Sequence, residues 1–220
     1  MDNFERKLVE MKEVYHAIED QFLEFNQIIP YGHNTEWESI YSPRLVTLLF
    51  SIGPQIETMI KSLMEKMNLK PRNDGKNFYD FFNVINERNL LSCHEVGLTV
   101  PGYPNKSIMP FEKNSDGDLE WWWAYNQIKH HMPEGMYHGT LRNAINALAA
   151  LSVLHHVAYS LIVWPDKEDF SKFLDSVEWK TDEESGVIAH HPNENLLPNE
   201  LPAWWSSKVF FFSTRKYDIA

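Results

Sequence analysis

The segment Trp121–His131, WWWAYNQIKHH, is the feature that most restricts how this chain can fold. Successive residues of a helix point about 100° apart, so three consecutive tryptophans cannot all face one core. We therefore expect at least one of Trp121, Trp122 and Trp123 to be deeply buried and one to be largely exposed. The helix that carries them is expected at the edge of a core, with indole rings both inside and at the surface.

A small polar cluster follows the tryptophans. Asn126, Lys129 and His130 lie at positions i, i+3 and i+4, which share one face of a helix. An aromatic wall that includes Trp122 and Tyr125 therefore adjoins an amide, an ammonium and an imidazole, a combination typical of a recognition or catalytic site. The alternative is a helix end at which Lys129 and His130 point into water, because basic residues are favoured near helix C-termini.

The composition indicates a soluble protein of the cytoplasm. The 220 residues carry a formal net charge of −11, which argues against a broadly basic nucleic-acid-binding surface but leaves room for a local basic cleft. A single cysteine, Cys93, excludes an intramolecular disulfide and suits a reducing compartment. The N-terminus has no apolar core of the signal-peptide type. The longest apolar region, residues 144–164, is interrupted by asparagine, serine and histidine, so we expect a buried helix and no membrane contact.

Apolar spacing predicts an all-α fold, a bundle of about five main helices with a small irregular C-terminal appendage. The predicted helices cover residues 3–26, 43–67 and 78–90, the tryptophan segment up to Pro133, and residues 141–163. Ser42 and Thr140 are the expected N-caps of the second and fifth helices, and the fifth is the most apolar and is expected at the centre. Residues 97–117 contain three prolines and are expected to form a long surface loop.

We assign residues 1–178 to the bundle, including a short additional helix at residues 169–177. Residues 179–220 form the appendage, which is not an independent domain. Two short β-prone stretches, near residues 186–189 and 208–213, are predicted to form a hairpin or lid.

Two resemblances to known proteins bear on function. The stretches 110–130 and 140–151 resemble a group of uncharacterised bacterial helical proteins. The segment Glu87–His94, ERNLLSCH, is similar to the arginine–histidine signature of the HEPN superfamily, in which a histidine follows an arginine after four to six residues. The resemblance implies a helical bundle that forms a homodimer, with Arg88 and His94 of both protomers meeting in one cleft. Active members cleave RNA without a metal and leave a cyclic phosphate; others act as nucleotide binders, antitoxin partners or scaffolds.

Two sets of residues are candidates for this chemistry. Arg88 offers a bidentate contact to phosphate and His94 a proton-transfer group. In the rival set, Lys129 neutralises phosphate, His130 transfers a proton and Asn126 orients either, while Arg142, in the first turn of the next helix, closes on the same cleft. The alternatives are structural, with Arg88 at a helix end, His94 in a loop and Asn126 bonded to the backbone. The main hypothesis is a metal-independent ribonuclease or an RNA-binding component of a defence or toxin system, with a protein partner. The competing hypothesis is a non-catalytic scaffold that binds a small ligand or another protein.

No cofactor or metal is expected. Adjacent helical residues diverge, so the pairs His130–His131, His155–His156 and His190–His191 are poor chelators, and no HExxH or paired CxxC spacing occurs. His155 lies on the apolar stripe of the fifth helix and is interpreted as a core histidine. No Walker loop, dinucleotide-binding glycine pattern or GxSxG motif is present.

Overall fold

The fold is the predicted all-α helical bundle. A computed structural model describes residues 3–30, 35–89, 91–98, 107–163, 179–181, 188–190 and 207–213. Its five α-helices are α1 (Asn3–Ile28), α2 (Pro43–Lys66), α3 (Phe78–Asn89), α4 (Glu120–His130) and α5 (Leu141–Val163). Short 3-10 helices, η1 (Thr35–Ser39), η2 (Leu91–Cys93) and η3 (Glu134–His138), precede α2, follow α3 and follow α4. The predicted short helix at residues 169–177 lies outside the described residues.

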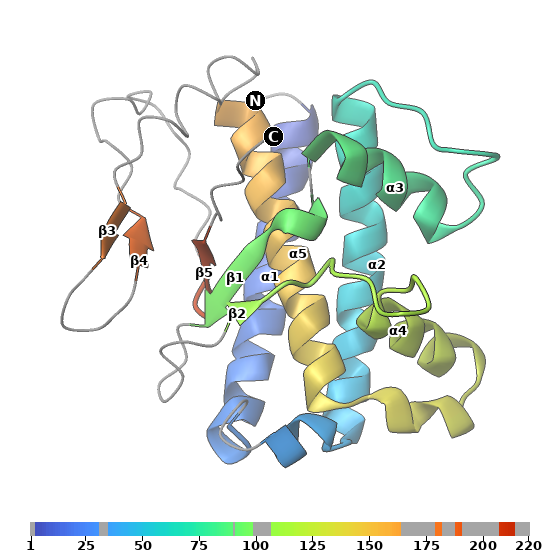
Figure 1. The fold of residues 1–220 in the computed structure, drawn as a ribbon, viewed down its shortest axis with the longest axis vertical. Coiled ribbons are helices and arrows are strands. Elements are labelled where there is room, and N and C mark those ends of the chain that lie inside the picture. Colours follow the sequence, from blue (N-terminus) through green and yellow to red (C-terminus); the bar gives the residue numbers. More distant parts are fainter. Residues whose placement is uncertain are drawn as a thin grey trace.

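The prediction placed α5 at the centre of the bundle, and the structure places α2 there beside it. Helix α5 packs most extensively against α2 and also against α1 and α4, whereas α2 packs against all four other α-helices. Figure 1 shows α1, α2 and α5 side by side along the long axis, with α3 and α4 beside α2. Among the described residues, α5 is the one helix long and apolar enough to cross a membrane, but 72% of its apolar window is buried within the protein. Such burial is expected of the core helix of a soluble protein.

Two helices begin where the sequence predicted. Ser42 is the N-cap of α2, and its side chain accepts a hydrogen bond from the backbone N–H of Arg44 at 3.3 Å, with Pro43 in the first turn. Thr140 precedes α5, and its Oγ1 accepts from the backbone N–H of Asn143 at 3.3 Å. These bonds satisfy backbone donors that have no partner within the helix.

The strands are arranged differently from the prediction. A C-terminal hairpin exists, but its antiparallel strands are β3 (Trp179–Thr181) and β4 (Ile188–His190). The last strand, β5 (Phe210–Ser213), pairs instead with β1 (Glu95–Leu98), which also pairs with β2 (Ser107–Ile108). The predicted surface loop at residues 97–117 is therefore wrong at residues 97–98 and 107–108, because these belong to β1 and β2 of a three-stranded sheet in which β1 is buried. Pairing between segments more than one hundred residues apart leaves no local pattern in the sequence.

Candidate functional site

A depression of about 450 Å³ lies where α3 and α4 meet α2, and we call it the α2–α4 depression. It falls in the size range of small-ligand sites. Its lining comes from helices α2, α3 and α4, from the connection between α2 and α3, and from Asp118. The lining residues are Glu57, Ile60, Lys61, Gly75, Lys76, Asn77, Phe78, Tyr79, Phe81, Asp118, Trp122, Trp123, Asn126, Lys129 and His130.

The three tryptophans of α4 divide between core and surface, which confirms the prediction from helical geometry. Trp121 and Trp122 are 3% and 6% exposed, whereas Trp123 is 42% exposed. The Trp121 Nε1–H donates to the carbonyl of Pro110 at 2.6 Å, so its polar atom is satisfied inside the protein. The ring of Trp122 stacks on Phe78 with centroids 3.9 Å apart, and both rings line the depression. Trp123 brings an exposed indole to the same depression.

Asn126, Lys129 and His130 come together in the depression, as their helical spacing predicted. The Lys129 ammonium lies 3.5 Å from Oε1 of Glu57 and 5.3 Å from the ring centroid of Tyr125. Burial alone would lower the pKa of Lys129, but Tyr125 and Glu57 raise it above its usual value. Lys129 is therefore a cation at neutral pH. The Asn126 amide donates to the carbonyl of Trp122 at 3.0 Å, one turn earlier in the same helix.

Tyr125 lies beneath the site. It is 2% exposed and does not line the depression. Burial raises its pKa, and its ring packs edge-on against Phe50. The ammonium of Lys129 lies over the ring of Tyr125, and this cation–π contact supports the Lys129 side chain.

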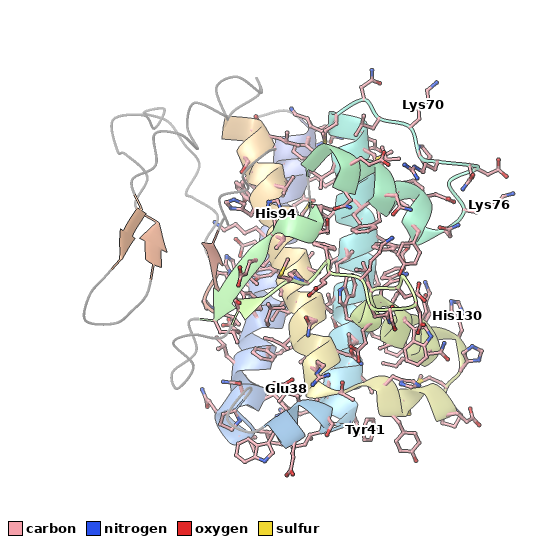
Figure 2. All side chains as sticks on the ribbon, in the orientation of Figure 1. Glu38, Tyr41, Lys70, Lys76, His94 and His130 are labelled. Atoms are coloured by element: carbon pink, nitrogen blue, oxygen red, sulfur yellow. The ribbon has the colours of Figure 1, made fainter. Side chains whose placement is uncertain are left out.

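Arg142 occupies a different place from the cleft proposed for it. It lines a second hollow of about 280 Å³ with Trp121 and Asn146. Its Nε lies 3.1 Å from Oε2 of Glu38, a carboxylate that is almost fully buried. Figure 2 shows Glu38 near the start of α5, well away from His130. Arg142 thus joins η1 to α5 and does not line the α2–α4 depression.

Arg88 and His94 lie on different elements. Arg88 is in the last turn of α3, which ends at Asn89, and its side chain is outside the described residues. His94 follows η2 and directly precedes β1; it is half-buried, and its backbone N–H donates to Leu91 at 3.1 Å. His94 and His130 are far apart in Figure 2. The two candidate sets therefore do not form a single site.

Comparison with known proteins adds no further information. No protein-family model and no solved structure matches this chain. Within the part of the chain that the structure describes, no three His, Cys, Asp or Glu side chains gather as they would around a metal ion. Function is therefore inferred from the side chains that line the depression.

Asp80 is a residue that the sequence reasoning missed. It is 4% exposed, and its carboxylate accepts hydrogen bonds from the side chain of Asn73 at 2.7 Å and from the backbone N–H groups of Lys76 and Asn77 at 3.1 and 3.2 Å. The bond from Asn73 is the main cause that lowers its pKa, so Asp80 is ionised at neutral pH. A signal was present, because an Asn followed three residues later by an Asp before an apolar run resembles a capping box.

Proposed function

We propose that this protein binds single-stranded RNA in the α2–α4 depression, as a cytoplasmic component of a bacterial defence or toxin system. One observation carries the proposal: an exposed indole, Trp123, shares a depression with Lys61, Lys76, Lys129 and His130, although the whole chain is strongly acidic. Aromatic side chains provide surfaces on which bases stack, and ammonium groups neutralise phosphates. The resemblance of residues 87–94 to the HEPN signature supports the same class of ligand.

Charge reversal at the depression tests the binding. Lys76 and Lys70 are both exposed lysines of the α2–α3 connection, but Lys76 lines the depression and Lys70 does not. Figure 2 labels both. We expect Lys76→Glu to weaken binding of a fluorescein-labelled oligouridine by about tenfold and to reduce the salt dependence of binding, because one phosphate contact is lost. Lys70→Glu, with the same change of net charge, should bind like the wild type in fluorescence anisotropy. Folded wild-type protein that does not bind the oligonucleotide would refute the proposal.

Metal-independent cleavage of the bound RNA is a second candidate function. The supporting observation is that Lys129 and His130 line one depression, so a cation for the phosphate and an imidazole for proton transfer are close together. In this reaction the 2′-hydroxyl loses its proton and attacks the adjacent phosphorus, and the 5′-oxygen leaves with a proton, which gives a cyclic phosphate. Cleavage should persist in excess chelator and fall about 10²–10⁴-fold in His130→Ala. Loss in His94→Ala and Arg88→Lys, with His130→Ala unaffected, would assign cleavage to the other pair.

Binding without cleavage, with intact RNA after long incubation, would favour the non-catalytic scaffold. We also propose a homodimer, as the resemblance implies, with a further protein partner such as an antitoxin. Light scattering should then give about twice the 25.9 kDa of one chain at micromolar concentration. A mass of one chain at all concentrations would rule out a cleft shared between protomers.

A further inference from the structure

The connection between α2 and α3 is folded around the carboxylate of Asp80. One oxygen of this carboxylate accepts from Asn73, and the other accepts from the backbone N–H groups of Lys76 and Asn77. The side chain of Asn77 in turn accepts from the backbone N–H of Asp80 at 3.0 Å. This reciprocal pair has the geometry of a capping box at the start of α3. The last residues of the connection are thus fixed to α3 by one side chain.

The backbone of the connection is also restricted. Asn73 and Gly75 adopt positive φ angles of 48° and 63°. A Cβ atom on Gly75 would lie 2.9 Å from Cγ of Pro71 and 3.2 Å from Cζ of Phe81, so the turn packs closely against itself and against α3. The backbone N–H of Arg72 donates to the carbonyl of Asp80 at 2.9 Å, which ties the other end of the turn to the same residue.

This connection supplies one rim of the α2–α4 depression. Gly75, Lys76 and Asn77 line the depression, whereas Asp80 does not. The ammonium of Lys76 is exposed and lies 2.7 Å from the carboxylate of Asp74 within the same turn. An anionic ligand must therefore compete with Asp74 for Lys76, and the place of Lys76 depends on the backbone that Asp80 holds.

We infer that Asp80 is a positioning residue of the binding site: it does not touch the ligand, but it sets the place of Lys76 and Asn77 on the rim of the depression. This inference rests on the proposed function, because it assigns a role in that site. A residue that only caps α3 would affect stability and leave ligand affinity unchanged. A positioning residue would affect affinity through Lys76.

A double-mutant comparison separates these two roles. The binding of labelled oligouridine is measured for Lys76→Ala, Asp80→Ala and the double variant. We expect each single variant to weaken binding by about three- to tenfold. The double variant should have the same affinity as whichever single variant binds more weakly, because both substitutions remove the same contact. Ser42→Ala is the matched control, because it removes the N-cap of α2 away from the depression. It should lower stability without changing affinity.

Two results would overturn the inference. One is wild-type affinity in folded Asp80→Ala, and the other is a double variant whose fold-loss of affinity is the product of the two single fold-losses. Amide hydrogen exchange tests it without any ligand. The N–H groups of Lys76 and Asn77 should exchange at least about tenfold faster in Asp80→Ala, while those of α4 exchange at the wild-type rate. If the wild type binds no RNA, the proposed function fails, and the exchange still decides whether Asp80 holds the rim. Unchanged exchange at Lys76 and Asn77 would overturn the inference under either result.

Discussion

At the scale of single residues, Gly53 of α2 lies directly against the ring of Tyr125 in α4. A Cβ atom on Gly53 would lie 2.4 Å from Cε2 and Cζ of Tyr125. In a helix interior, replacing glycine by alanine ordinarily stabilises a protein by about 0.5–1 kcal/mol. At Gly53 we expect alanine to destabilise the protein instead, because the buried Tyr125 ring must move to make room for the methyl group. We expect Gly53→Ala to lower the free energy of unfolding by about 1–3 kcal/mol, measured by urea denaturation.

The control for this prediction is the same substitution in a Tyr125→Leu background. Leucine removes the ring atoms that the new methyl group would meet, so the penalty of Gly53→Ala should become smaller there. An equal penalty in both backgrounds would show that the ring is not its cause.

At the scale of elements, the helices could be predicted and the sheet could not. The spacing of Leu8, Met11, Tyr15 and Phe22 identifies the buried face of α1, and all four residues are buried. Helical periodicity is a local signal, so it also predicted the shared face of Asn126, Lys129 and His130. Strand β1 was missed because it pairs with β5, and no property of residues 95–98 alone reveals this partner. The cleft proposed for Arg142 rested on its place in the first turn of the next helix, and that place could not reveal the contact of Arg142 with Glu38.

Helix α5 carries a buried imidazole that should make stability depend on pH. His155 is fully buried, with its ring 5.4 Å from that of Tyr15, which confirms its interpretation as a core histidine. Burial, together with the nearby charges of His16 and Lys12, lowers the pKa of His155 from 6.5 to about 3. Below pH 6.5 the unfolded chain therefore binds a proton that the folded protein does not bind. The stability contributed by the neutral imidazole is present above about pH 6.5 and is lost as the pH falls towards 3.

The size of this effect is about 1.4 kcal/mol per pH unit inside that window. Carboxylates also titrate there, so the test compares the wild type with His155→Leu by urea unfolding at pH 7, 6 and 5. We expect the variant to lose less stability on acidification than the wild type does. Parallel losses in the two proteins would mean that folding does not lower the pKa of His155.

At the scale of the whole molecule, one carboxylate joins the first helix to the last strand. Glu19 of α1 is fully buried, and its Oε1 accepts hydrogen bonds from the hydroxyl of Tyr15 at 3.0 Å, from the Ser207 hydroxyl, and from the backbone N–H groups of Lys208 and Val209 at 2.9 and 3.1 Å. In the sequence, Glu19 appears as an ordinary acidic residue of an amphipathic helix. Its partners lie nearly two hundred residues away, so no local pattern could reveal its role.

Removing this carboxylate should detach the C-terminal strand from the bundle. Glu19→Ala removes an acceptor from the N–H groups of Lys208 and Val209, beside the buried Val209 and Phe210 side chains, and the Val209 N–H keeps its 3.1 Å bond to the Ser207 hydroxyl. Buried donors without a partner are costly, so we expect the free energy of unfolding to fall by about 2–4 kcal/mol. Glu19→Gln keeps one acceptor oxygen and should lose less. Glu24→Ala is the matched control on the same helix. Glu24 is 68% exposed and lies 3.9 Å from Arg44 in a surface ion pair, which should contribute less than about 1 kcal/mol.

Hydrogen exchange shows which part of the protein is affected. The amides of residues 208–213 should exchange faster in Glu19→Ala than in Glu24→Ala, whereas the amides of α4 should exchange at the wild-type rate. Equal exchange of the strand in the two variants would show that its pairing with β1 and the packing of Val209 and Phe210 hold it in place without Glu19.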